Sequence, residues 1–219
     1  VETKGKVHGQ TLFRFGSTTK NLTGLCILKL VHEGKLSLYD TVKKIAPEVP
    51  VINPWEETHP IKVINVLEHT TGFRKGYMIP RAISTSGTNP KGLDMLIYFK
   101  HNLVADIKPG EHCVYGNVNY MLAGYLIEKV TGRPWDEYVI ENIFKPLGMT
   151  NTNLDQQFPD ELKYARGYVF VDGVNKPVPF FTIRSNGASS ALNTCADDMA
   201  KFLKFYLNNW KVDTLQWLP

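Results

Sequence analysis

The stretch from Ser17 to Gly34 constrains the fold more than any other part of this 219-residue chain. Its apolar side chains fall on nearly every side of a helical cylinder, and they are Leu22, Leu25, Cys26, Ile27, Leu28, Leu30 and Val31. A helix that is apolar all round has to be covered by other elements. We therefore predict a buried central helix that begins near Ser17 and is stopped by Gly34.

The other periodic segments are mainly helical. Apolar spacing predicts further helices near residues 62–68, 93–102, 117–130, 134–143 and 195–207. The pair Asp172-Gly173 between two alternating segments predicts a β-hairpin over 164–181. Residues 72–91 are rich in Gly, Ser, Thr and Pro, which indicates a long loop of a kind that often serves function. The pattern indicates a mainly helical single domain spanning residues 1–219.

Composition and charge exclude several classes of protein. Apolar residues make up 43% and charged residues 21%, which is typical of a globular domain. The net charge is +4 and the basic residues are scattered, so we predict no nucleic-acid partner. No apolar run approaches the roughly 20 residues of a membrane span. Cys26, Cys113 and Cys195 lack metal-ligand spacing, so we interpret them as buried hydrophobic residues and predict no metal.

Ser17 and Lys20 are the first candidates for chemistry. On a helix, three residues advance by about 300°, which places the two side chains on one face. A serine hydroxyl becomes a good nucleophile when a neighbouring group accepts its proton, and a lysine of lowered pKa is such a group. The alternative is structural, with Ser17 as a helix cap and Lys20 in solvent. The four residues 17–20 alone favour that alternative, because this spacing arises by chance about once in such a chain.

The second candidate is Tyr115-Gly116-Asn117. A tyrosine near an amine can relay protons, and an asparagine can orient both groups. A second Tyr-x-Asn at Tyr206-Leu207-Asn208 lies at the end of an amphipathic segment, so we interpret it as packing and capping. Tyr115 instead follows a Pro-Gly turn and precedes a predicted helix, and such junctions often carry functional groups.

Taken together and in order, these segments resemble the class C β-lactamase and related esterase family of serine β-lactamases and penicillin-binding proteins. The matching segments cover nearly the whole chain, and they are residues 13–20, 67–72, 109–120, 128–132, 146–152 and 192–199. Each motif by itself has low specificity for the family. Their common order and spacing make coincidence remote, and this reverses the preference for a structural role of Ser17.

The resemblance implies a role for each matching position. Ser17 is implied to be the acylated nucleophile, Lys20 its activator and Tyr115 the proton shuttle to the leaving group. Asn117 is implied to bind substrate or to hold Lys20. The stretch around His69 matches a structural corner of the family, so His69 is left out of the predicted site.

Two parts of the family pattern are absent from the sequence. The third motif, Lys-Thr-Gly or a variant, is not found after Met199, and only 16 residues precede Ser17. We therefore expect an α+β fold of the β-lactamase/transpeptidase type, represented mainly by its helical part and a short hairpin, with most of the antiparallel sheet missing. Another chain that completes the sheet is an expected partner, and we expect impaired activity in this segment alone.

The function implied by the resemblance is that of a serine hydrolase acting through an acyl-enzyme on an ester or amide. Esterase, D-amino-acid peptidase and β-lactamase activities share the first two motifs and stay open. The implied partner is a small-molecule or peptide-like substrate, with no cofactor, in the periplasm or outside the cell. The alternative is a non-catalytic β-lactamase-like binding module, against which the intact set of Ser17, Lys20 and Tyr115 argues.

Overall fold

The computed structural model describes residues 5–76, 90–154, 163–180, 183, 187–212 and 215–218. In chain order the elements are β1 (Phe13–Gly16), α1 (Thr19–His32), α2 (Val42–Ile45), α3 (Val63–Leu67), η1 (Arg74–Gly76), α4 (Gly92–Tyr98), η3 (Lys100–Asn102), α5 (Asn117–Thr131), α6 (Trp135–Val139), η4 (Ile140–Phe144), β2 (Tyr168–Val171), β3 (Val174–Pro177), α7 (Gly187–Ser190), β4 (Leu192–Thr194), α8 (Ala196–Leu207), β5 (Lys211–Val212) and β6 (Leu215–Gln216). None of the described helices is both long and apolar enough to cross a bilayer.

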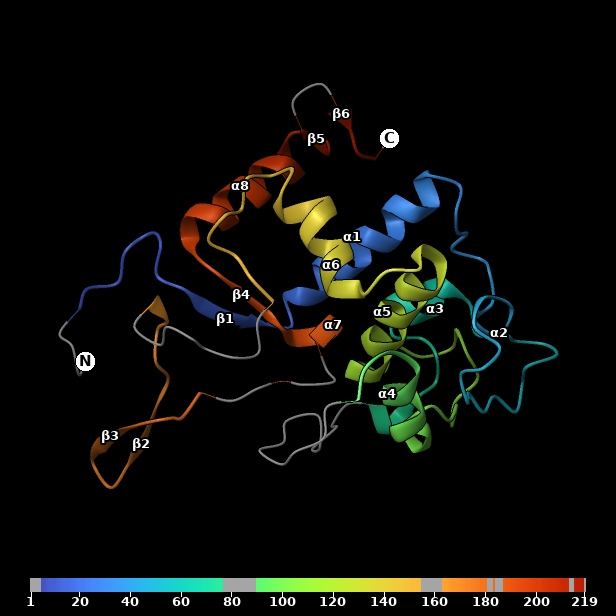
Figure 1. Cartoon of the computed structure of the whole chain (residues 1–219). Coiled ribbons are helices and arrows are strands. Elements are labelled where there is room, and N and C mark those ends of the chain that lie inside the picture. Colours follow the sequence, from blue (N-terminus) through green and yellow to red (C-terminus); the bar gives the residue numbers. More distant parts are fainter. Residues whose placement is uncertain are drawn as a thin grey trace.

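The predicted central helix is confirmed as α1. It begins at Thr19, two residues after Ser17, and its chain turns away at Gly34, whose φ of +69° suits glycine. Its buried apolar residues point in several directions, and they are Leu22, Leu25, Cys26, Ile27 and Leu30. Helices α5, α6 and α7 pack around α1, as Figure 1 shows near the centre of the molecule. The apolar circumference of α1 is therefore what places the core at this point.

The second long helix, α5, follows the prediction closely. It begins at Asn117 and ends at Thr131, where Gly132 adopts a left-handed conformation. Gly124 allows a close approach to α7, because a β-carbon at this position would lie 2.6 Å from Ala188 Cβ. Glycine inside a helix costs about 0.5–1 kcal/mol relative to alanine, which the close packing offsets.

The described strands form three two-stranded antiparallel sheets. The hairpin is confirmed as β2 and β3, although each strand is shorter than predicted, and Figure 1 shows it projecting from the body. Strand β1 pairs with β4, in a register that joins Phe13 to Thr194 and Gly16 to Leu192. The pairing of β1 with β4 was not predicted, because short strands 170 or more residues apart leave no local signal. This pairing holds β1, which leads into α1, beside β4, which leads into α8.

Some predictions need correction. The predicted helices over 93–102 and 134–143 are each divided, the first into α4 and η3 and the second into α6 and the π-helical η4. Cys26 and Cys195 are buried as predicted, but Cys113 is exposed, so its interpretation as a core residue was wrong. Most of the predicted loop over 72–91 lies outside the described residues.

Candidate active site

Ser17 and Lys20 lie at the junction between β1 and α1, with their polar atoms in contact. Lys20 is the second residue of α1 and is buried. Its Nζ donates to Ser17 Oγ at 3.1 Å, to Asn117 Oδ1 at 2.9 Å and to the Ser189 carbonyl at 3.2 Å. These three acceptors match the three N–H bonds of an ammonium group. Lys20 is thus held in one position by α1, α5 and α7 together.

Tyr115 completes the cluster, and its ring centroid lies 4.8 Å from Lys20 Nζ. Its hydroxyl donates to Ser17 Oγ at 2.9 Å, and 40% of the residue's surface is exposed. Ser17 Oγ therefore accepts hydrogen bonds from both Lys20 and Tyr115. The structure brings together all four residues that the sequence analysis selected, although they come from two segments about 100 positions apart.

The surroundings alter the pKa values of the two ionisable groups. Burial lowers the pKa of Lys20, and its interaction with Tyr115 opposes this change. Burial by itself raises the pKa of Tyr115, but hydrogen bonds with Lys20 and Ser17 outweigh it, so the pKa falls below the usual tyrosine value. Both changes reduce the free energy needed to lose a proton near neutral pH, as proton acceptors in catalysis require.

His69 holds the backbone on both sides of Tyr115. Its carbonyl accepts from the Val114 N–H at 2.8 Å, and its Nδ1 accepts from the Gly116 N–H at 3.2 Å. His69 is 9% exposed as a residue, and its ring centroid lies 4.5 Å from that of Tyr115. His69 also adopts a φ of +61°, which is unusual for a residue with a side chain. These contacts assign His69 to the positioning of Tyr115.

The buried imidazole predicts a pH dependence of folding stability. Burial first, and then the charge of Lys20, lower the pKa of His69 to about 4. On acidification the unfolded chain binds a proton near pH 6.5, whereas folded His69 stays neutral until about pH 4. The free energy of unfolding should therefore decrease as pH falls through this window, by about 3 kcal/mol.

Urea unfolding of wild type and His69→Gln between pH 7 and pH 4 measures this effect. The stability advantage of the wild type over the variant should shrink as the pH falls. The exposed His101→Gln is the matched control and should give a parallel profile to wild type. Equal pH dependence in His69→Gln and the wild type would contradict the account.

The structure also reveals contacts that the sequence analysis missed. Ser189 contributes its carbonyl to Lys20, and a backbone acceptor has no signature in the sequence. One helical turn below Lys20, Thr23 Oγ1 donates to the Ala188 carbonyl at 2.7 Å and accepts from Trp135 Nε1 at 3.0 Å. Helices α6 and α7 are thereby tied to the face of α1 that carries Lys20. No group of three or more potential metal-ligating side chains occurs among the described residues.

Comparisons with known proteins agree with this arrangement. The sequence model of the family described as Beta-lactamase matches residues 1–216. Protein flp of Staphylococcus aureus is 33% identical over 215 residues, which are 95% of this chain and 41% of that protein. The chain thus spans less than half the length of this curated relative.

Solved structures show the same fold. The D-amino acid amidase from Ochrobactrum anthropi SV3 has a TM-score of 0.78 and 25% identity, covering 99% of this chain and 61% of the amidase chain. The octameric penicillin-binding protein homologue from Pyrococcus abyssi has a TM-score of 0.76 and 28% identity, and the match covers 96% of this chain and 48% of the homologue's chain. The fold is therefore that of the β-lactamase/transpeptidase class, an α+β fold. By its sequence match and its structure, the chain belongs to the β-lactamase family.

Proposed function

We propose that this chain carries the acyl-transfer site of a serine hydrolase acting on esters or amides. The observation that supports it most is the pair of hydrogen bonds into Ser17 Oγ, from Lys20 at 3.1 Å and from Tyr115 at 2.9 Å. A helix cap alone needs neither partner. A serine hydroxyl between two groups of lowered pKa has the geometry of an activated nucleophile.

In the proposed reaction, Ser17 Oγ attacks the carbonyl carbon of the substrate. Lys20, in its neutral form, accepts the hydroxyl proton, and Tyr115 passes a proton to the leaving alcohol or amine and regains one from Lys20. The bond between the carbonyl carbon and the leaving group then breaks, which gives an ester on Ser17. Water attacks this ester, returns a proton to Ser17 and releases the acid. Asn117 Oδ1 accepts from Lys20 Nζ at 2.9 Å, and its proposed role is to hold this amine and to bind the substrate.

We propose that the substrate is a small ester or a peptide-like amide, in preference to a β-lactam. The family includes the amidase and the penicillin-binding protein homologue named above, which supports this breadth. The exposed edge of Tyr115 leaves room for an acyl donor from solvent. A second chain as a partner stays a prediction, and the Pyrococcus homologue is itself octameric.

Pre-steady-state hydrolysis of p-nitrophenyl acetate tests this function. With this activated ester, acylation should be faster than deacylation, so the wild type should release a burst of nitrophenolate that matches the enzyme concentration. Ser17→Ala should show no burst. The exposed Ser37→Ala is a matched control and should keep it. Nitrophenolate release that persists unchanged in Ser17→Ala, or a folded wild type that releases none above the buffer rate, would contradict the proposal.

A further inference from the structure

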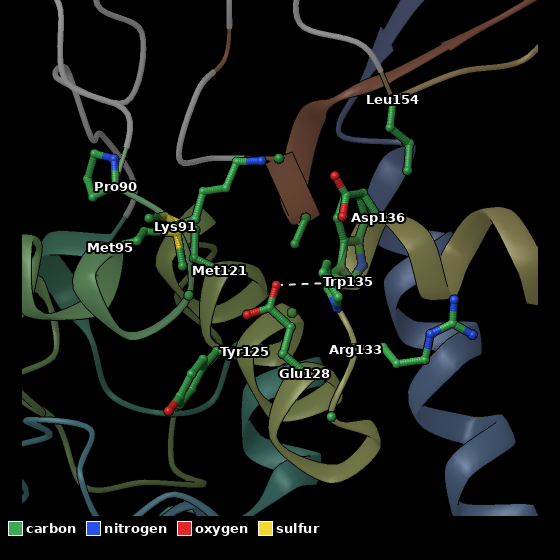
Figure 2. A pocket seen from close by; sticks show the side chains of 16 residues that line it. Pro90, Lys91, Met95, Met121, Tyr125, Glu128, Arg133, Trp135, Asp136 and Leu154 are labelled. Atoms are coloured by element: carbon green, nitrogen blue, oxygen red, sulfur yellow. Dashed lines mark hydrogen bonds between the residues drawn. The ribbon is translucent and has the colours of Figure 1, made fainter.

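A cavity lies apart from the Ser17 cluster. It has a volume of about 500 Å³, and none of Ser17, Lys20, Tyr115 or Asn117 lines it. It lies between α4, α5, α6 and α7, and Figure 2 shows the side chains around it. We call it the α5–α7 pocket, and the lining residues used below are Lys91, Met95, Met121, Glu128, Trp135 and Asp136. Its volume is in the range of sites that take small molecules.

The walls of the α5–α7 pocket are mostly apolar and buried. Met95 comes from α4, Met121 from α5 and Trp135 from α6, and all three are at most 6% exposed as residues. Trp135 is held by two hydrogen bonds, from its Nε1 to Thr23 Oγ1 and from its backbone N–H to Glu128 Oε1. A large aromatic face fixed in this way, with two adaptable thioethers, suits a flat apolar group.

A carboxyl group interrupts this apolar lining. Glu128 on α5 is partly buried, and Figure 2 shows its carboxyl group facing the pocket. Its Oε1 accepts from the Trp135 N–H at 3.1 Å, and a carboxylate has further lone pairs to offer. Burial raises the pKa of Glu128 and so does the nearby charge of Asp136, although the hydrogen bond from Trp135 and the charge of Lys91 act in the opposite direction. A cation brought to this carboxylate would relieve both effects.

The cationic side chains on the rim do not neutralise the pocket. Arg133 pairs with Glu141 at 2.7 Å and with Glu137 at 3.7 Å, and Figure 2 shows its guanidinium group turned away from Glu128. Lys91 is exposed, and it forms no ion pair within 4.0 Å among the parts of the chain that the structure describes. Its long side chain can remain in solvent while a ligand occupies the interior. Because Arg133 is paired with Glu141 and Glu137, the charge of Lys91 offsets one of the two carboxylates of Glu128 and Asp136, and one negative charge remains in excess inside apolar walls.

We propose that the α5–α7 pocket is a second ligand site, for a small apolar amine whose ammonium group meets Glu128 and whose aromatic or branched body packs against Trp135, Met95 and Met121. The match is one of charge and shape. An ammonium group donates charge-assisted hydrogen bonds to a carboxylate, and the apolar body covers the walls. The site stands independently of the acyl-transfer function proposed for Ser17.

Methyl NMR of the chain labelled with 13C at methionine tests the site. On titration with 2-phenylethylamine, the methyl signals of Met95 and Met121 should shift, with a Kd of about 1 mM for a probe of this size. Signals of Met149 and Met199, which do not line the pocket, should stay in place. Phenylacetate, which reverses the charge on a similar body, should bind at least about tenfold more weakly.

Two variants locate the interaction. Glu128→Gln keeps an acceptor for the Trp135 N–H but removes the charge, and it should weaken binding of 2-phenylethylamine by about tenfold. The exposed Glu57→Gln is the matched control and should bind like the wild type, as should Ser17→Ala. The proposal would be overturned if the methyl signals of Met95 and Met121 did not shift. It would also be overturned if binding were equally strong in wild type and Glu128→Gln, and for 2-phenylethylamine and phenylacetate.

Discussion

Replacing Lys20 by methionine should lower the rate of Ser17 acylation by about 10³-fold. Lys20 is the buried amine that touches Ser17 Oγ, and general acid–base groups contribute about 10²–10⁴-fold. Methionine has a similar length but accepts no proton from serine. It also leaves Asn117 Oδ1 and the Ser189 carbonyl without their donor, at a cost of about 1–3 kcal/mol each in stability. Rates should therefore be compared at a temperature where circular dichroism shows both proteins folded.

Two further variants separate proton transfer from charge and from folding. Lys20→Arg keeps a positive charge but cannot lose its proton near neutral pH, so it should be nearly as slow as Lys20→Met. Lys29→Met changes a lysine on the same helix whose partner is Glu33, and it should acylate like the wild type. If Lys20→Arg retained most of the wild-type rate, Lys20 would act by charge alone and the proposed proton transfer would be wrong.

Gly72→Ala should have the largest effect on stability, lowering the free energy of unfolding by about 3 kcal/mol or more. Gly72 has a φ of +82°, and a β-carbon there would lie 2.0 Å from the Ile107 carbonyl oxygen. Its own carbonyl accepts from the Asp106 N–H at 3.0 Å, so the backbone cannot move away without losing that bond. The turn that carries His69 ends at this residue, and acylation should fall with stability.

Gly34→Ala provides the comparison for Gly72→Ala. Gly34 also has a positive φ, +69°, but no atom lies within 4 Å of a β-carbon placed there. Only the conformational cost should appear, about 1 kcal/mol. Urea unfolding of both variants measures the difference. Equal destabilisation in the two would show that the contact with Ile107 does not restrict Gly72.

The long helices were predictable because their signals are local. The apolar circumference of α1 and the spacing of apolar residues along α5 each indicate a helix. Gly34 and Gly132 mark where the chain turns after each of these helices. The hairpin was predictable from Asp172-Gly173 for the same reason. The division of α6 from η4 was not, because it depends on packing of the segment rather than on its own residues.

The candidate site was predictable only through combined motifs. Ser17 and Lys20 are close because of helix geometry, but nothing local places Tyr115 against Ser17. The resemblance supplied that link. The Ser189 carbonyl and the hydrogen bonds of His69 on both sides of Tyr115 were missed, since each of these bonds has a backbone atom of a distant segment as one partner. Such contacts follow from the tertiary fold and leave no pattern of residue types.

The central claim is that Ser17 is an activated nucleophile in this chain. Labelling with a fluorophosphonate probe, read by intact mass, tests it most directly, because the probe reacts with activated serines without depending on substrate choice. We expect a single adduct on the wild type, none on Ser17→Ala, and the full adduct on the Ser37→Ala control. No adduct on folded wild type, or an unchanged adduct on Ser17→Ala, would contradict the claim and favour a binding relative of the family.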